Sequence, residues 1–155
     1  MPITIVTGAW PEYTGYNPEL SDNAYSGELS KVVATNGEVD TLVKGESVYL
    51  VLDTTLKWKR TIATTEATCN KTLGMVIADI ATGGVCVQNI LLRGFYRNDT
   101  VFTLTIGGLL YLATTAGDLT QTAPSGSGEI VRVVGLAIKA STIYFNPDNT
   151  WIVRV

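Results

Sequence analysis

The sequence predicts an all-β fold, and three observations support this class. Short apolar runs rich in Val, Ile, Leu and Thr are separated by Gly, Pro, Asn and Asp, which is the pattern of strands joined by turns. No long stretch combines helical spacing with helix caps. The 22 threonines of the chain also suit strands. We therefore expect a compact β-barrel or β-sandwich of about eight to ten short strands.

Residues 1–26 differ from the rest and predict an extended N-terminal arm. Prolines recur in this segment, and no period of a helix or strand holds. Disordered segments are usually poor in aromatic residues, whereas this one carries Trp10, Tyr13 and Tyr16. We expect these three rings to anchor the arm on a partner. An arm folded onto its own domain and a disordered terminus are the alternatives.

A single all-β domain is expected over residues 27–155. It begins with a strand-like run over 27–35, and Asn36-Gly37 is a strong hairpin signal. The other strands expected before residue 107 are 39–43, 47–52, 56–62, 72–80, 85–92 and 101–106. Between them, 64–70 is expected to be a loop or a single helical turn, and 93–100 a loop.

The run Lys57-Trp58-Lys59-Arg60 allows two interpretations. It could be a basic aromatic patch for nucleic acid or sugar. However, Trp58 and Arg60 fall on one side of an alternating strand, and Lys57 and Lys59 on the other. The alternation alone therefore explains the run as a half-exposed strand.

The last third of the chain, residues 107–155, has the clearest pattern of strands and turns. Short strands are expected at 109–112, 129–138, 142–145 and 151–155, with turns at 114–118, 124–128 and 146–149 between them. This region resembles the C-terminal β-module of bacteriophage virion proteins, namely capsid decoration (cement) proteins and some head-fibre or tail-fibre proteins. The residues that carry the resemblance are Tyr111, Leu112, Thr114, Thr115, Ala116, Gly117, Thr122, Ala123, Pro124, Gly128, Val134, Gly135, Ala137, Phe145 and Pro147.

Two segments of the domain, 45–80 and 107–140, resemble each other. The run that starts at Gly45 matches the run that starts at Gly107, and a Gly inside an apolar run follows in both, at Gly74 and Gly135. Such a Gly suggests a bulge or bend. The repeat predicts an internal duplication, although all-β chains also repeat such patterns by chance.

Composition limits the partners that the chain is expected to bind. The net charge is −3, which disfavours nucleic acid because its binders usually carry a basic patch. Charged residues make up 16% of the chain, against about 25% in an average soluble domain. A protein surface with so few charges tends to adhere to other proteins. We therefore expect part of it to be covered by other copies of the chain or by a larger assembly. No membrane span or signal peptide is expected.

The sequence offers little to catalyse a reaction. It contains no histidine, which removes the usual general base and most zinc sites. Cys69 and Cys86 are too few for a metal cage and are expected to be free thiols. The acidic residues are spread over turns and strand ends, and no phosphate-binding loop is present. We therefore expect a non-enzyme without cofactor or metal.

The resemblance implies a capsid decoration protein on the outer surface of the virion, made in the host cytoplasm. Such a protein binds the major capsid protein and itself, as a homotrimer, and stabilises the shell by bridging its subunits. Trp10, Tyr13 and Tyr16 are the expected capsid-binding residues, and Trp151, Ile152 and Val153 the expected self-association residues. A buried core position is the alternative for Trp151.

A different class, a head-fibre or tail-fibre module that binds a host-surface receptor or glycan, is the alternative function. A glycan site would place an aromatic ring beside amides and acids. Asn146, Asp148, Asn149 and Trp151 are the candidates for it.

Overall fold

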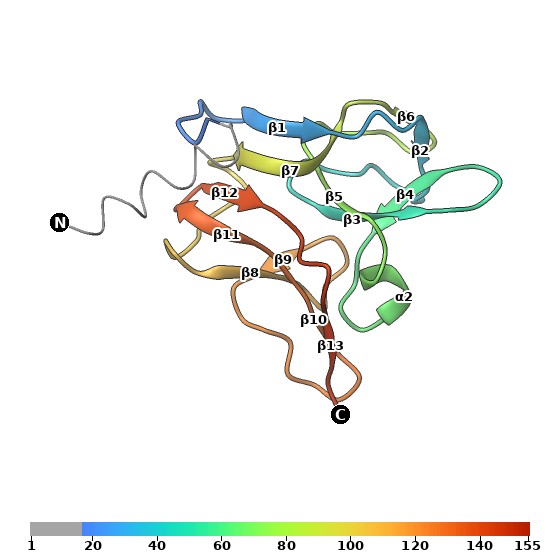
Figure 1. Cartoon of the computed structure of the whole chain (residues 1–155). Coiled ribbons are helices and arrows are strands. Elements are labelled where there is room, and N and C mark those ends of the chain that lie inside the picture. The colour runs from blue at the N-terminus through green and yellow to red at the C-terminus, as the bar shows by residue number, and fades with distance from the viewer. Residues whose placement is uncertain (1–16) are drawn as a thin grey trace.

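The structure, a computed structural model, describes residues 17–155 and is built almost entirely from strands (Figure 1). Within that range one helical turn, α2 (Glu66–Cys69), interrupts them, as the sequence predicted for residues 64–70. The all-β prediction is thus confirmed. The strands are β1 (Tyr25–Leu29), β2 (Ala34–Asn36), β3 (Ser47–Val51), β4 (Lys57–Arg60), β5 (Leu73–Val76), β6 (Val85–Cys86), β7 (Ile90–Arg97), β8 (Leu109–Leu112), β9 (Leu119–Thr120), β10 (Ile130–Val131), β11 (Val133–Lys139), β12 (Thr142–Phe145) and β13 (Ile152–Val153).

One large sheet contains eleven of these strands, in the order β6-β2-β4-β3-β5-β7-β12-β11-β8-β9, with β1 paired to β7 outside this path. The path has two ends, so the sheet is not a closed barrel. A separate ribbon of β10 and β13 extends from it toward the C-terminus, at the bottom of Figure 1. The pairs along the path from β4 to β9 are all antiparallel, whereas β2 and β4 are parallel.

The core is divided between two clusters of buried side chains. Met75 and Leu91 belong to one cluster, and their chain neighbours Val76 and Ile90 belong to the other. Because successive side chains of a strand point to opposite faces, β5 and β7 carry one cluster on each face. The central strands of the sheet are therefore buried on both sides.

The strand order reads alike from both ends of the antiparallel path. One half is β4-β3-β5-β7 and the other is β9-β8-β11-β12, and β7 joins β12 in the middle. The two similar sequence segments supply corresponding strands, since β3, β4 and β5 lie in 45–80 and β8, β9 and β11 lie in 107–140.

The residue pairing also corresponds. Gly74 of β5 lies opposite Val48, and Gly135 of β11 lies opposite Leu110. These are the positions that the sequence comparison aligned.

Loop hydrogen bonds next to these strands repeat as well. The N–H of Gly45 donates to the carbonyl of Val76 at 2.7 Å, and the N–H of Gly107 donates to that of Ala137 at 2.7 Å. Both glycines have positive φ, +94° and +83°. This agreement supports the internal duplication, which stays a prediction about the origin of the sequence.

The hairpin predicted at Asn36-Gly37 is wrong. Strand β2 ends at Asn36 and pairs with β4 and β6, and residues 39–43 contribute only a bridge between Leu42 and Ile80. The Asn36 side chain is buried and donates to the carbonyls of Asp40 and Ile80, both at 2.8 Å. Asn36 therefore closes the turn through its side chain instead of through a left-handed backbone.

Two further predictions between residues 93 and 106 are wrong. The expected loop 93–100 is largely strand, because β7 continues to Arg97. Gly94 makes this extension possible, since it lies opposite Gly27 of β1, and a Cβ at Gly27 would lie 2.2 Å from the carbonyl oxygen of Arg93. The expected strand 101–106 is irregular, and the Asn98 side chain accepts the N–H of Val101 at 2.9 Å.

The described part of the predicted arm, residues 17–26, lies against the domain. Arg97 donates to the carbonyl of Leu20 at 2.8 Å, and Lys139 pairs with Glu19 at 2.6 Å. Strand β1 begins at Tyr25. The boundary between arm and domain stays a prediction, because most of the arm lies outside the described residues.

Candidate functional site

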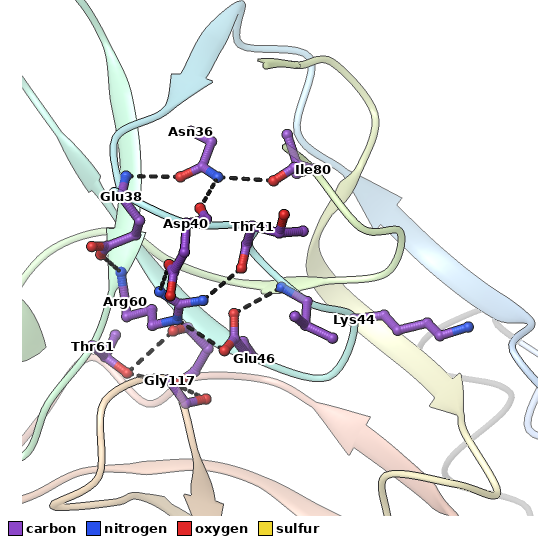
Figure 2. Close-up of polar contacts among 12 residues, drawn as sticks. Asn36, Glu38, Asp40, Thr41, Lys44, Glu46, Arg60, Thr61, Ile80 and Gly117 are labelled. Carbon is purple, nitrogen blue, oxygen red and sulfur yellow. Dashed lines mark hydrogen bonds and ion pairs between the residues drawn. The ribbon is translucent and has the colours of Figure 1, made fainter. Parts of the chain in front are cut away.

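The densest polar cluster surrounds Arg60 on β4 (Figure 2). Its Nε donates to Glu46 at 2.8 Å, its Nη1 to Asp40 at 2.6 Å, and its Nη2 to the carbonyl of Thr41 at 2.7 Å. Glu38 accepts the backbone N–H of Arg60 at 2.7 Å. Burial alone would lower the pKa of Arg60, but the hydrogen bonds to Glu46 and Asp40 raise it above its usual value.

Beside this cluster, the turn before β9 is joined to the first half of the sheet. The N–H of Ser47 donates to the carbonyl of Gly117 at 2.7 Å, and the N–H of Gly117 donates to that of Thr61 at 2.8 Å. Each nitrogen of the Arg60 guanidinium has a partner within the chain. The cluster is therefore a structural connection between chain segments and offers a ligand no unpaired guanidinium nitrogen.

The run 57–60 forms strand β4, with its side chains on alternating sides as the sequence predicted. Trp58 is fully buried, and Lys57 and Lys59 on the other side are half-buried. The indole N–H of Trp58 is buried and has no partner among the described residues. Because the only ring of the run is inside the core, it cannot stack on a base or a sugar.

Both cysteines are free and buried, as the sequence predicted for their thiol state. Burial raises the pKa of the Cys86 thiol to about 11. Among residues 17–155, no group of three Cys, Asp or Glu side chains is placed to hold a metal ion.

The residues predicted for self-association lie at the C-terminal end. Strand β13 pairs with β10 through Ile152 opposite Val131 and Val153 opposite Ile130. The exposed fractions are 36% for Trp151, 62% for Ile152 and 42% for Val153, so none is a core residue. The alternative that Trp151 is an ordinary core ring is wrong.

One edge of β13 is not paired with a strand of the described residues. The N–H of Arg154 donates to the carbonyl of Glu129 at 2.9 Å, and its carbonyl accepts the N–H of Gly128 at 2.8 Å. Backbone groups alternate in direction along a strand, so those of Val153 point away from β10. Within the described chain β13 has no second partner strand.

A hollow of about 600 Å³ lies between Trp151, the turn 146–149 and strands β3, β5 and β7. Three other hollows of the described residues have similar volumes, about 590, 640 and 430 Å³, so the lining residues and not the size distinguish this one. Its lining residues are Glu28, Leu50, Leu52, Asn70, Lys71, Thr72, Leu73, Leu92, Arg93, Arg132, Asn146, Pro147, Asn149 and Trp151. Three of the four candidates for a glycan site, Asn146, Asn149 and Trp151, are therefore brought to one concavity.

The Trp151 ring in this hollow is held from two sides. Its Nε1 donates to Glu66 of α2 at 2.9 Å. The Arg132 guanidinium lies over the ring, 5.7 Å from the centroid, at cation–π distance. The indole is thus positioned by one anion and one cation.

Arg132 is 5% exposed and holds the walls of the hollow together. Its Nε donates to the carbonyl of Asp148 at 2.7 Å, and its Nη1 donates to the carbonyls of Cys69 and Lys71, the latter at 3.1 Å. These contacts join the C-terminal end of α2 and Lys71 to the turn 146–149. Burial lowers the pKa of Arg132, and the nearby Cys69 and Asp148 oppose this.

The fourth glycan candidate, Asp148, does not line the hollow. Its carboxylate accepts the N–H and the hydroxyl of Thr150, each at 2.9 Å. The hydrogen bond from the Thr150 N–H is the main reason that its pKa is lowered. Asp148 therefore shapes the turn from which Asn149 projects.

The sequence did not identify Arg132, Glu66 or Asn70 as parts of a site. The one available signal was Arg132 itself, a charged residue between the apolar Val131 and Val133. The predicted arm residues Trp10, Tyr13 and Tyr16 lie outside the described residues.

The comparisons with known proteins leave the family open. No protein-family model matches the chain, and a search of curated proteins finds no significant match. No helix in the described range 17–155 is long and apolar enough to cross a membrane.

Proposed function

We propose that the chain is a bacteriophage structural protein, a capsid decoration protein that binds the outside of the shell and bridges major capsid protein subunits. The protein performs no reaction in this role. Many shallow contacts, repeated by symmetry, provide the avidity that one contact lacks. It is made in the host cytoplasm and acts on the virion surface, without nucleic acid, membrane or cofactor as a partner.

The exposed strand β13 carries this proposal. It presents Ile152, 62% exposed, and an unpaired strand edge to the outside. Exposed edges of this kind are templates for pairing with another chain, and a homo-oligomer, a trimer in our proposal, would cover it. The low charged fraction, 16% of the chain, agrees with this role. The resemblance of residues 111–147 to phage β-modules is the sequence expectation from which the proposal starts.

Self-association is tested by sedimentation equilibrium of the whole protein. We expect an oligomer for the natural sequence and a shift to monomer for Ile152→Asp, because a charge would be buried in the contact. Val39→Asp is the matched control, since Val39 is 93% exposed elsewhere on the surface. A monomer at every concentration, or equal loss of association in both variants, would overturn the self-association.

Binding to the shell is tested by electron microscopy of purified particles that contain the protein. Decoration predicts regular density over the whole shell. Density confined to a vertex or to the tail would support a fibre module instead.

The second candidate function is a head-fibre or tail-fibre module that binds a host-surface receptor or glycan. The observation that favours it is the hollow in which Asn146, Asn149 and Trp151 meet. An aromatic ring beside side-chain amides provides an apolar face and hydrogen-bonding groups at one site. Both candidates bind and do not catalyse.

A further inference from the structure

We infer that the hollow beside Trp151 binds an acidic saccharide, that is, a sugar residue that bears a carboxylate. The inference rests on the glycan-binding interpretation of this hollow and adds the charge of the ligand to it. It does not depend on whether the protein decorates a shell.

The charge around the hollow is opposite to that of the protein. Three cationic side chains, Lys71, Arg93 and Arg132, line it beside Glu28, and a second carboxylate, Glu66, contacts the edge of the Trp151 ring. The chain as a whole carries a net charge of −3. A local excess of positive charge in a concave site raises the local concentration of anions, so an anionic ligand is favoured there.

Arg132 strengthens this argument because its charge is buried without a salt bridge. No carboxylate of residues 17–155 lies within ion-pair distance of it, and its hydrogen-bond acceptors in that range are all backbone carbonyls. Its Nη2 donates to none of the described residues. Asp148 acts on Arg132 only from beyond ion-pair distance. A buried guanidinium without a directly paired carboxylate is costly, and a carboxylate bound in the hollow would offset that cost.

A buried, unsatisfied polar atom lies in the same wall. Oδ1 of Asn70 is buried and has no hydrogen-bond partner among the described residues, and Asn70 lines the hollow. An unpaired buried acceptor costs free energy, and a sugar hydroxyl would supply the missing donor. A carboxylate alone could not, because it has no proton to donate.

The half-exposed ring of Trp151 provides the remaining element of saccharide recognition. Its indole is fixed by Glu66 and Arg132, so little side-chain freedom remains to be lost when a ligand packs on it. The hollow thus combines an aromatic ring, side-chain amides, an unpaired acceptor on Asn70 and cationic side chains. This combination matches a sugar acid better than a neutral sugar or a simple anion.

Binding is tested by nuclear magnetic resonance titration of the whole protein, observing the indole N–H of Trp151. The probes are methyl glucuronoside and methyl glucoside, which differ in a carboxylate that replaces a hydroxymethyl group. We expect the glucuronoside to bind at least about tenfold more tightly, a difference of the size that one charge-assisted contact produces. Its affinity should fall as salt is added.

Variants at the rim separate the hollow from general surface charge. Lys71→Gln should weaken the glucuronoside severalfold and leave the glucoside unchanged. Lys31→Gln, at an exposed lysine outside the hollow, should change neither. Asn149→Ala should weaken both sugars. Arg132 is left intact because its three backbone contacts hold the walls.

Several outcomes would overturn the inference. Equal binding of the two sugars would leave a glycan site standing but refute its preference for acid. Equal binding of the glucuronoside and N-acetylglutamate amide would indicate an acidic peptide as the ligand. No binding of either sugar would refute the glycan site as well.

Discussion

Nε of Arg60 donates to Oε1 of Glu46 over 2.8 Å, and the two side chains are 14% and 19% exposed. A hydrogen bond between charged groups that are this sheltered contributes about 1.5–3 kcal/mol. We expect Glu46→Gln to lower the free energy of unfolding by about that amount, measured by urea denaturation.

Asp40 provides the matched comparison on the same guanidinium. It contacts Nη1 of Arg60 at 2.6 Å but is 66% exposed. Asp40→Asn should therefore cost only about 0–1 kcal/mol, because water screens the pair. Equal losses in the Asp40 and Glu46 variants would contradict the structural role assigned to this cluster.

Gly135 is expected to be intolerant of a side chain. A Cβ at this position would lie 2.3 Å from the carbonyl oxygen of Tyr144 on the neighbouring strand, and backbone cannot move aside as a flexible side chain can. Gly135→Ala should destabilise by about 3 kcal/mol or more.

The control for Gly135 is Gly107→Ala. Gly107 has φ +83° and open space around the added atom, so its cost is the left-handed backbone alone, about 1–2 kcal/mol. Thermal unfolding of both variants tests the ranking, and a larger loss for Gly107→Ala would show that the β11–β12 approach is misplaced.

Cys86 should be inert while the protein is folded. It is 1% exposed, and burial raises the pKa of its thiol to about 11; the pKa of Cys69 is also raised, mainly by burial. Because the thiolate is the reactive form, iodoacetamide should label neither cysteine at neutral pH and both in urea. Labelling of the native protein at the denatured rate would contradict this.

Protonation of Asp99 is expected to account for part of the stability that the fold loses at low pH. Arg97 donates to both of its carboxylate oxygens at 2.7 Å and lowers the pKa of Asp99 from its ordinary 3.8 to about 2. The unfolded chain therefore takes up this proton first as the pH falls, so the stabilisation present above pH 3.8 is lost toward pH 2.

Asp99→Asn is expected to flatten the stability curve over that window and leave its slope near neutral pH unchanged. The effect should be small, because the pair is solvent-exposed. The midpoint of urea unfolding, measured at a series of pH values, tests this. An unchanged acid limb would contradict the assigned pKa.

Local pattern was enough to predict the fold class and many strands. Alternation located β4, and the short apolar runs at 109–112 and 142–145 coincide with β8 and β12. Prediction from local pattern failed where residues distant in sequence determine the local structure. Strand β7 extends through Gly94 only because Gly27 lies opposite, and Asn36 uses its side chain on Ile80.

The hollow could be predicted only in part for the same reason. Asn146 and Asn149 share one turn, and Trp151 follows it by two residues. Arg132 and Glu66 reach them through pairing of β10 with β13 and packing of α2. Contacts between residues so far apart in the chain leave no local pattern to detect.

The central claim is that many copies of this protein adhere to one shell. The most direct test is the copy number of the chain relative to the major capsid protein, measured by quantitative mass spectrometry of purified virions. Our account predicts a fixed, simple ratio with copies over the whole shell. A handful of copies per virion, or none, would contradict it.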